Sequence, residues 1–395
     1  MGTVATDVQS IVIVGTGAAG YAVAEGLHTE GFTGAVTLVG EEQGEPYDRP
    51  PLSKEVLSGA WEPSRAALIA ARRVEPLHPT ILTGVRAVAL EVTDQRVELS
   101  DGRSLPYDAV VIATGVAPRR LEHPDVPNIR VLRTMDDALA LRALLVDGGR
   151  RLLVVGGGFL GLEAAATARG LGATVTVVEP IPGPPLASRI GNEAATKLLA
   201  THRAHGVEVF TGIGVASLDV AADGTVRATL SDGTTIEADV VLVAVGSVPN
   251  TRWLEGSGLE IVNGVVCDAY CSAAPGVWAA GDVASWQHVG YERRLRLEHR
   301  TNAQEQGLAV ARNIVGDPRP FTPVPYFWTY QYDVRIQVHG QIVDVDRNDI
   351  VEGAPGDDTF VQTFSFDGKV TAALGWNAAR RMAEFRRQLL DAMPA

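Results

Sequence analysis

The residues with the clearest chemistry in this chain are two sets of glycines with the spacing G-x-G-x-x-G, at residues 15–20 and 156–161. This spacing permits a tight turn, lets the backbone approach a pyrophosphate, and lets a helix pack closely against the preceding strand. The N–H groups at the start of that helix then hold the phosphates. The glycines are Gly15, Gly17, Gly20, Gly156, Gly158 and Gly161. Each set therefore predicts a dinucleotide-binding turn.

Each glycine set belongs to a longer unit that ends in an acid. Apolar strands are expected at residues 11–14 and 152–155, just before the turns, and a second strand follows each turn. Glu41 follows the second strand of the first unit, and Glu179 ends that of the second unit. A carboxylate at this point accepts hydrogen bonds from ribose hydroxyls. Because both units are complete, we expect two bound dinucleotides rather than two glycine-rich turns with a purely structural role.

The acid of the second unit also indicates which nicotinamide nucleotide binds. NADPH carries a 2′-phosphate that requires Arg or Lys just past the second strand. Here Glu179 is followed by a proline-rich loop at residues 180–188, and the first basic residue is Arg189. A carboxylate repels a phosphate and accepts from ribose hydroxyls, so NADH is expected. Because proteins with two dinucleotide sites are mostly flavoenzymes, FAD is the expected occupant of the first unit.

The elements that position these turns alternate between strand and helix along most of the 395 residues. This alternation predicts an α/β fold with parallel, doubly wound sheets. A buried strand and a small-residue turn close the first unit at residues 107–115, and similar endings follow at 239–246 and 276–282. The third ending suggests that the chain returns to its first domain after completing a second. We therefore expect two Rossmann-like dinucleotide-binding domains, the second inserted in the first.

The C-terminal part has a different character. Residues 334–340 and 359–364 alternate apolar and polar side chains, and Asp367-Gly368 is a hairpin turn signal, which together predict an antiparallel sheet. The chain then ends in an amphipathic helix, so the third domain is expected to be α+β. The expected boundaries are residues 1–118 and 246–322 for a discontinuous FAD-binding domain, 119–245 for a NAD-binding domain, and 323–395 for a C-terminal interface domain.

Composition and charge narrow the classes of partner. Hydrophobic residues make up 46% of the chain and the mean hydropathy is +0.09, as in soluble globular proteins. A net charge of −13 argues against nucleic acid or an anionic membrane as the main partner. No apolar run reaches the roughly 18 residues that span a bilayer. Residues 1–10 lack the basic region of a secretory signal, so the cytoplasm is the expected compartment.

The two cysteines limit the redox chemistry. Cys267 and Cys271 lie in a segment, residues 264–271, that reads as a strand far from either glycine turn. No further Cys or His ligands lie nearby, so we expect two packed thiols and no metal site. A disulfide reductase of the glutathione type needs a vicinal cysteine pair after the first acidic strand, and residues 41–57 contain no cysteine. Hydride that enters a flavin here must leave another way, most simply as single electrons.

Several short motifs follow one another along nearly the whole chain. Besides the two glycine turns, they lie at residues 46–54, 132–134, 280–282 and 325–328. In this order they resemble the NADH-dependent ferredoxin reductases of the putidaredoxin reductase type, and the Pro-Pro-Leu-Ser-Lys block is the most specific element. The resemblance implies FAD and NADH as cofactors and a [2Fe-2S] ferredoxin as partner, which would serve a cytochrome P450 or a dioxygenase. Either a monomer or a homodimer is compatible with it.

The resemblance also assigns roles to individual residues. Lys54 and Glu163 would be catalytic, meeting as an ion pair near the flavin N5 in a partly dry site. The residues assigned to FAD are Gly15, Gly17, Ala18, Ala19, Gly20, Glu41, Arg49, Lys54, Ala87, Ala113, Thr114, Gly115, Arg133, Gly281, Asp282, Glu298, His299, Arg300 and Trp328. The residues assigned to NADH are Gly156, Gly158, Phe159, Leu160, Gly161, Glu163, Glu179 and Gly246.

The chain departs from the family pattern on the expected acceptor side. Arg300 stands where relatives often have an aromatic or apolar residue, and Thr329-Tyr330 stands where they commonly have Ser-Asp. The loop at residues 180–188 lacks the usual arginine. Two groups of arginines could form a local docking patch for an acidic ferredoxin, or the second group could simply be a solvated helix face. They are Arg293, Arg294, Arg296 and Arg300, and Arg380, Arg381, Arg386 and Arg387.

Other functions remain open at this point. A rubredoxin reductase is one alternative, and an NADH oxidase is another, which would turn over NADH rapidly in air without an added carrier. A redox-signalling flavoprotein of the apoptosis-inducing-factor type would instead keep a long-lived charge-transfer complex and turn over slowly. The C-terminal helix ends the chain and leaves little room for a regulatory tail, which favours an enzyme.

Overall fold

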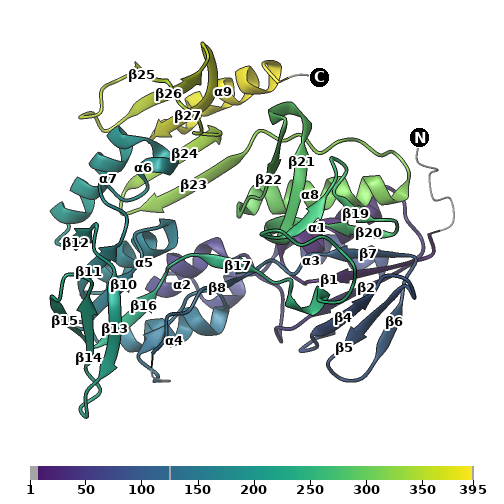
Figure 1. The fold of residues 1–395 in the computed structure, drawn as a ribbon, viewed down its shortest axis with the longest axis horizontal. Coiled ribbons are helices and arrows are strands. Elements are labelled where there is room, and N and C mark those ends of the chain that lie inside the picture. The colour runs from purple at the N-terminus through teal and green to yellow at the C-terminus, as the bar shows by residue number, and fades with distance from the viewer. Residues whose placement is uncertain (1–7, 124–125, 394–395) are drawn as a thin grey trace.

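Runs of buried β-branched residues build a six-stranded sheet near the N-terminus of the computed structural model, which describes residues 8–123 and 126–393 (Figure 1). Strands covered on both faces read as continuous apolar runs, and β1 carries Ile-Val-Ile-Val and pairs in parallel with β2 and β7. In sheet order the strands are β19(Ser272–Ala274), β20(Val277–Ala279), β7(Ala109–Ile112), β1(Ser10–Val14), β2(Ala35–Gly40) and β3(Thr80–Thr83).

The chain returns to this first sheet after building another, as the sequence predicts. Strand β20 pairs in parallel with β7, although a complete second unit separates them in the sequence. The two crossings between the units lie side by side, because β8(Val116–Pro118) and β17(Ser247–Pro249) pair as an antiparallel ribbon. This confirms the insertion of the second unit in the first. The boundaries given above for the three domains stay predictions.

The second unit repeats the plan of the first. Its parallel sheet contains, in order, β12(Glu208–Thr211), β11(Thr174–Glu179), β10(Arg151–Val155), β16(Val240–Val243) and β9(Ile129–Arg130). Its helices are α4(Met135–Leu145), α5(Phe159–Gly170), α6(Ala187–Ile190) and α7(Asn192–Ala204). Each unit also carries an antiparallel three-stranded sheet that was not predicted from the sequence. These are β4(Ala87–Glu91), β5(Arg96–Leu99) and β6(Ser104–Pro106), and β13(Val215–Val220), β14(Val226–Leu230) and β15(Thr235–Ala238).

A further small sheet corrects one expectation. The strand expected over residues 264–271 ends early, as β18(Val265–Cys267), because Cys271 lies in a turn with φ +63°. Both cysteines are buried and free. The partners of β18 are β21(Ala284–His288) and β22(Arg293–Leu295). The remaining short helices are η1(Pro50–Ser53), α2(Glu55–Ser58), η2(Pro63–Ala66), α3(Ile69–Arg73), η3(Glu75–Leu77), η4(Arg252–Leu254), η5(Gly281–Val283) and η6(Val289–Tyr291).

The predicted C-terminal antiparallel sheet is confirmed. Its strands in order are β23(Tyr326–Gln331), β24(Val334–Gly340), β27(Lys369–Trp376), β26(Phe360–Phe366) and β25(Arg347–Glu352). The turn between β26 and β27 has φ +49° at Asp367 and +71° at Gly368, the left-handed pair that suits a two-residue hairpin. The amphipathic helix α9(Ala379–Asp391) follows, and it buries Met382 and Leu389.

One hydrophobic core joins parts of all three units. Leu52 and Val56 from the first unit, Leu162 from the second, and Ile336 and Trp376 from the C-terminal sheet belong to the same buried cluster. The side chains adjacent to these core residues in the sequence are therefore brought close together where the three units meet. None of the helices within residues 8–123 and 126–393 is long and apolar enough to cross a membrane. The expectation of no secretory signal concerns residues 1–10, of which 1–7 lie outside the described residues.

Two helices of the first unit pack almost backbone to backbone. Helix α1(Ala18–Thr29) lies along α8(Arg300–Val315) in Figure 1. A Cβ built at Gly307 would lie 2.6 Å from the carbonyl oxygen of Ala19, and one at Gly26 would lie 2.6 Å from the Cβ of Ala311. Glycine at both positions allows this approach, which brings the start of α8 close to the first glycine turn.

Candidate active site

A cavity of about 1770 Å³ lies where the two parallel sheets and the C-terminal sheet meet. Pockets for single small ligands usually have about 300–1,000 Å³, so this one has room for more than one. Every residue assigned to FAD except Gly20 lines the cavity. From the NADH set the lining residues are Gly158, Phe159, Leu160, Glu163 and Gly246. Gly156, Gly161 and Glu179 do not line it.

The first glycine turn combines tight packing with one open position. Gly15 has φ +125°, and a Cβ there would lie 2.2 Å from the carbonyl oxygen of Ala113. A Cβ at Gly20 would lie 1.9 Å from the carbonyl oxygen of Gly15, whereas one at Gly17 would meet no atom of the described chain within 4 Å. Helix α1 begins at Ala18, directly after Gly17. The open space at the start of this helix is where a pyrophosphate fits.

The second glycine turn repeats this geometry. Gly156 has φ +110°, and a Cβ there would lie 2.3 Å from the carbonyl oxygen of Ala244. A Cβ at Gly161 would lie 2.1 Å from the carbonyl oxygen of Gly156, while one at Gly158 would have no described neighbour within 4 Å. Helix α5 begins at Phe159, directly after Gly158. The two turns thus present equivalent phosphate cradles, and the middle glycine of each borders the cavity.

The two acids assigned to ribose lie in different environments. The Glu41 side chain is 68% exposed, and its Oε1 is 3.2 Å from an arginine nitrogen of Arg86. The Glu179 carboxylate instead accepts the backbone N–H groups of Gly157, at 2.7 Å, and Ile181, at 3.0 Å. These bonds fix Glu179 against the second glycine turn. Each carboxylate oxygen can accept more than one hydrogen bond, so a ribose hydroxyl can still be bound.

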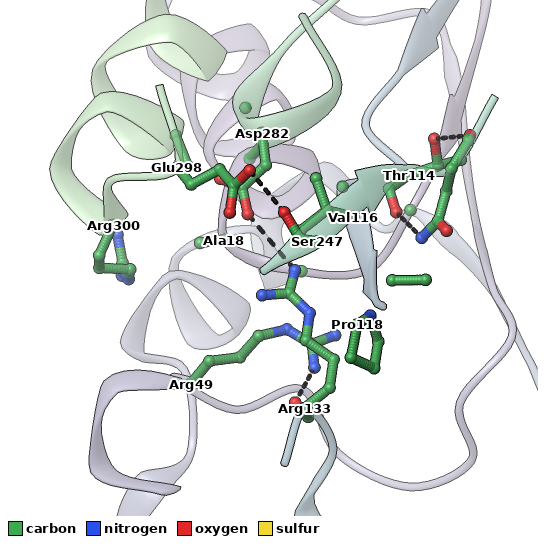
Figure 2. Close-up of a pocket in the computed structure, with 18 of the residues that line it drawn as sticks. Ala18, Arg49, Thr114, Val116, Pro118, Arg133, Ser247, Asp282, Glu298 and Arg300 are labelled. Atoms are coloured by element: carbon green, nitrogen blue, oxygen red, sulfur yellow. Dashed lines mark hydrogen bonds and ion pairs between the residues drawn. The ribbon is translucent and has the colours of Figure 1, made fainter. Parts of the chain in front are cut away.

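Charged side chains from several segments face one another across the first part of the cavity (Figure 2). Arg133 and Asp282 form an ion pair at 3.4 Å. Arg49 donates to the carbonyl oxygen of Arg133 at 2.5 Å and to Glu42 at 2.7 Å. Burial raises the pKa of Asp282 and lowers the pKa of Arg133, with the charge of Arg49 lowering the latter further. Because the charged forms of Asp282 and Arg133 are disfavoured by burial, a polar ligand that hydrogen-bonds to them would stabilise these charges.

Unpaired buried atoms test whether the cavity fits FAD. Arg133 Nε, Arg296 Nε and His299 Nδ1 are buried without a hydrogen-bond partner in the described structure. Buried polar atoms are normally satisfied, so these atoms point to a ligand. Burial, with the nearby charge of Arg189, lowers the pKa of His299 to about 4 and keeps the ring neutral. Donors, acceptors and an open pyrophosphate cradle together fit the phosphates, ribityl chain and ring of FAD.

The two residues assigned to catalysis come together beside this cavity. Lys54 Nζ lies 2.7 Å from Glu163 Oε2, and the side chains are only 14% and 10% exposed. Ser53 donates to the same carboxylate oxygen at 2.6 Å, and Thr329 donates to the other oxygen at 2.7 Å. Lys54 also donates to Ser53 at 3.0 Å. The pair is thus fixed by residues from three units of the fold.

Sequence reasoning missed Ser53 and the role of Thr329 as partners of Glu163. Ser53 lies inside the motif at residues 46–54, and Thr329 directly follows the motif at residues 325–328. Their contact with Glu163 depends on how three separate units pack, which spacing alone does not reveal. Arg189 also lines the cavity, next to the loop that lacks the usual arginine.

Most of the arginines suggested as a docking patch have partners within the chain. Arg294 donates to the carbonyl oxygens of Cys267 and Ser285, at 2.8 and 2.5 Å. Other arginines pair with acids, so that the positive charge of each is balanced locally. These pairs are Arg293 with Asp344, Arg296 with Glu298, Arg300 with Asp48, Arg381 with Glu352, and Arg386 with Glu305. Charge at this face is therefore weaker than the sequence suggests.

The chain is similar to known proteins over nearly its whole length. Residues 9–307 match the family model described as pyridine nucleotide-disulphide oxidoreductase, and residues 326–394 match the one described as reductase C-terminal. The chain is 38% identical to the ferredoxin–NAD(+) reductase component of the p-cumate 2,3-dioxygenase system of Pseudomonas putida, over 96% of this chain and 93% of that protein. It is 34% identical to rhodocoxin reductase of Rhodococcus erythropolis, over 98% and 90%. The crystal structure of the covalent putidaredoxin reductase–putidaredoxin complex matches with a TM-score of 0.92 at 32% identity, over 98% and 94%.

Proposed function

The chain belongs to the pyridine nucleotide-disulphide oxidoreductase family, and on this premise we propose that it is an FAD-dependent NADH:ferredoxin reductase. The observation that carries the proposal is the buried Lys54–Glu163 pair in a cavity bordered by both glycine turns. In the overall reaction one NADH reduces two one-electron [2Fe-2S] ferredoxins, and NAD⁺ and one proton are released. The ferredoxin would in turn serve a cytochrome P450 or a dioxygenase; the Pseudomonas putida relative is named as a component of a dioxygenase system.

The first glycine turn and the charged cluster would hold FAD. The open position at Gly17 and the N–H groups at the start of α1 suit the pyrophosphate. Arg49 and Arg133 supply positive charge beside it, and Asp282 supplies an acceptor for hydroxyl groups. When bound, FAD accepts a hydride from NADH and gives up the two electrons one at a time.

Lys54, held in place by Glu163, presents its positive charge to the cavity. Lys54 has three N–H donors, and its bonds to Glu163 and Ser53 use two of them. Within the described structure this leaves the third N–H for a ligand. A preorganised cation stabilises negative charge that develops during the reaction, and it acts most strongly where water is excluded. Glu163 holds this cation in place and prevents it from turning to solvent.

The second glycine turn would hold NADH. Gly158 leaves room for the pyrophosphate at the start of α5, and Glu179 accepts from the adenosine ribose. The same carboxylate repels a 2′-phosphate, so NADPH is a poor substrate. Glu163 lies just past the first turn of α5, so the nicotinamide nucleotide and the catalytic pair would share one helix.

Single electrons leave through the cavity rather than through a disulfide. Cys267 and Cys271 are buried in the first unit and do not line the cavity, and burial raises the pKa of both thiols. A ferredoxin must therefore approach the flavin edge of the cavity. We propose the cytoplasm as the compartment, because NADH and reduced carriers are available there.

Anaerobic stopped-flow mixing tests the proposal. The FAD-loaded protein is mixed with NADH or with NADPH, and the reduced protein is then mixed with a [2Fe-2S] ferredoxin. Rapid flavin bleaching by NADH but not by NADPH, followed by reoxidation as the ferredoxin is reduced, supports the reductase. Bleaching without transfer to several ferredoxins, but with prompt reoxidation in air, would instead identify an NADH oxidase. A long-lived charge-transfer band with slow turnover would indicate a signalling flavoprotein.

A further inference from the structure

A chain of hydrogen bonds leads from the Glu163 carboxylate away from the cavity. Thr329 Oγ1 donates to Glu163 Oε1 at 2.7 Å, and Gln331 Nε2 donates to Thr329 Oγ1 at 3.0 Å. Gln331 Oε1 lies 2.7 Å from His202 Nε2, and His202 Nδ1 lies 3.3 Å from the hydroxyl of Tyr332. Glu163 thus stands at one end of a continuous series of polar side chains.

The ionised carboxylate fixes the direction of every bond in the series. Glu163 can only accept, so Thr329 uses its single hydroxyl proton on Glu163 and must accept from the amide of Gln331. The carbonyl oxygen of Gln331 then faces His202, whose Nε2 must carry the proton. His202 Nδ1 is left as the acceptor for Tyr332. All donors therefore point toward the carboxylate, and their dipoles stabilise its negative charge.

Burial prevents the side chains of this series from adopting other orientations. Thr329 and Gln331 are 1% and 2% exposed, His202 is 0% exposed, and Glu163 is 8% exposed. A buried polar atom that loses its partner is costly, so the side chains have no cheap alternative orientation. Burial also lowers the pKa of His202, with the nearby His205 lowering it further, so the ring stays neutral as the direction of the bonds requires.

The outer end of the series is held by an unusual turn residue. Tyr332 lies between β23 and β24 with φ +56°, a left-handed conformation that a large side chain rarely adopts. Its ring stacks on His205, with 3.7 Å between ring centroids, and its hydroxyl meets His202. Both histidines lie on or directly after α7, in the second unit. The turn is therefore fastened to α7 at the outer end of the hydrogen-bond series.

We propose that Thr329, Gln331 and His202 are positioning residues for the Lys54–Glu163 pair. They hold one carboxylate oxygen so that the other stays on Lys54, which keeps the cation aimed into the cavity. The proposal rests on the proposed function, because it assigns these residues to the step in which NADH reduces the flavin. It adds that the C-terminal sheet and α7 set the geometry of the catalytic pair from a distance.

The first experiment compares variants of the FAD-loaded enzyme that differ in one hydrogen bond. Thr329→Val removes the hydroxyl at nearly constant shape, and Thr329→Ser retains it. Gln331→Leu breaks the next bond. We expect Thr329→Val and Gln331→Leu to lower the rate constant of flavin reduction at saturating NADH by about tenfold, with the Kd of NADH changed less than twofold. Thr329→Ser should restore the rate.

The matched control is Gln362→Leu. Gln362 is also a buried glutamine of the C-terminal sheet, and it also donates to a carboxylate of the second unit, Glu193, at 2.9 Å. Glu193 lies on α7 but does not line the cavity. A purely structural role for the buried glutamines predicts equal slowing by Gln331→Leu and Gln362→Leu, and that result would overturn the proposal. So would a rate unchanged in Gln331→Leu.

Two further readouts do not depend on turnover. The flavin midpoint potential should become more negative in Gln331→Leu and stay unchanged in Gln362→Leu, because a loosely held Lys54 stabilises the reduced flavin less. In the unaltered FAD-loaded protein, ¹⁵N NMR of labelled histidine should show His202 neutral with the proton on Nε2. A proton on Nδ1, or a charged ring at neutral pH, would contradict the direction of the series even if the variants failed to fold.

These readouts separate this proposal from the proposed function. If the variants slow flavin reduction as expected while no ferredoxin accepts electrons, the acceptor assignment fails and the positioning role stands. If ferredoxin is reduced normally and the variants match the control, the positioning role fails and the reductase function stands.

Discussion

At the residue scale, we expect the proposed function to depend on the charge of Glu163 rather than on its shape. Glu163→Gln keeps the size of the side chain but removes the charge that holds Lys54 at 2.7 Å. Hydrogen bonds between charged groups are the strong ones, and here both groups are largely buried. We expect flavin reduction by NADH to slow roughly tenfold or more in stopped-flow measurements, with FAD still bound. Glu305→Gln, which alters an exposed acid of α8, should leave the rate unchanged.

A substitution at the middle glycine of the first turn should affect cofactor binding without weakening the fold. Gly17 has a β-region backbone and open space at the Cβ position, so Gly17→Ala should leave the free energy of unfolding of the FAD-free protein unchanged or raise it by about 0.4–1 kcal/mol. The added methyl would occupy the pyrophosphate cradle, so FAD affinity should fall. Isothermal titration with FAD and urea unfolding measure the two effects.

Gly20→Ala is the complementary variant. Its Cβ would lie 1.9 Å from the carbonyl oxygen of Gly15, so the FAD-free protein should be destabilised by about 1–3 kcal/mol. If Gly17→Ala binds FAD normally, the pyrophosphate does not lie at this turn. The parallel variant Gly158→Ala should raise the KM for NADH without releasing FAD.

The sequence predicted the residues whose spacing is local and missed those brought together by packing. The glycine turns and Lys54 lie in short motifs, and a strand–turn–helix spacing carries its own geometry. Glu163 came from a second such motif. By contrast, Gln331 and His202 meet each other, and connect to Glu163 through Thr329, only because a hairpin of the C-terminal sheet rests on α7. No periodicity in either segment records that contact.

At the element scale, the contact between α1 and α8 depends on glycine. A Cβ at Gly307 would lie 2.6 Å from the backbone oxygen of Ala19 and 3.0 Å from the backbone nitrogen of Val23, neither of which can move without shifting α1. We expect Gly307→Ala to lower the free energy of unfolding by about 1–3 kcal/mol. The urea midpoint should fall while the slope of the transition stays constant.

The matched helix glycine is Gly170, at the end of α5, where a Cβ would meet no described atom within 4 Å. Gly170→Ala should be neutral or slightly stabilising. Equal destabilisation by the two substitutions would show that loss of glycine itself, rather than the close approach of α1 and α8, determines the stability.

Strands were predictable where the sequence alternates regularly, because one face is solvated, or where it runs continuously apolar, because both faces are buried. The alternation at residues 334–340 matches β24, and the apolar run at 11–14 lies within β1. The three-stranded sheets β4–β6 and β13–β15 escaped notice because the burial along their strands is mixed, without a continuous apolar run or a regular alternation. The expected strand to Cys271 was wrong because a left-handed turn residue leaves no extended backbone there.

At the scale of the whole molecule, buried histidines should make stability depend on pH. Four histidines have a pKa lowered by burial, to about 4 for His299 and for His339. The four are His202, His288, His299 and His339. The unfolded chain binds protons at these residues near pH 6.5, while the folded protein does not. The contribution of these four histidines to the free energy of unfolding is therefore fully present above about pH 6.5, and it is lost as the pH falls towards 4.

Urea midpoints measured at pH 7.5 and pH 5.0 check this expectation, and a midpoint that rises at pH 5.0 would contradict it. His339→Gln removes one contributor and should reduce the difference between the two midpoints. The raised pKa values of Asp282 and Glu305 act in the opposite sense. With two carboxyls against four histidines, the histidines should dominate in this pH range.

The insertion of one unit in the other sets an order of synthesis. Strand β20 completes the sheet beside β7, yet the ribosome reaches it only after making all of the second unit. At elongation speeds of about 5–20 residues per second, the unfinished first sheet waits roughly ten to thirty seconds. The part of the polypeptide made first is thus completed only after the whole second unit has been made. In nascent chains stalled before β20, the second unit should therefore resist protease and yet flavin should not be retained, which makes cofactor loading a late event of biogenesis.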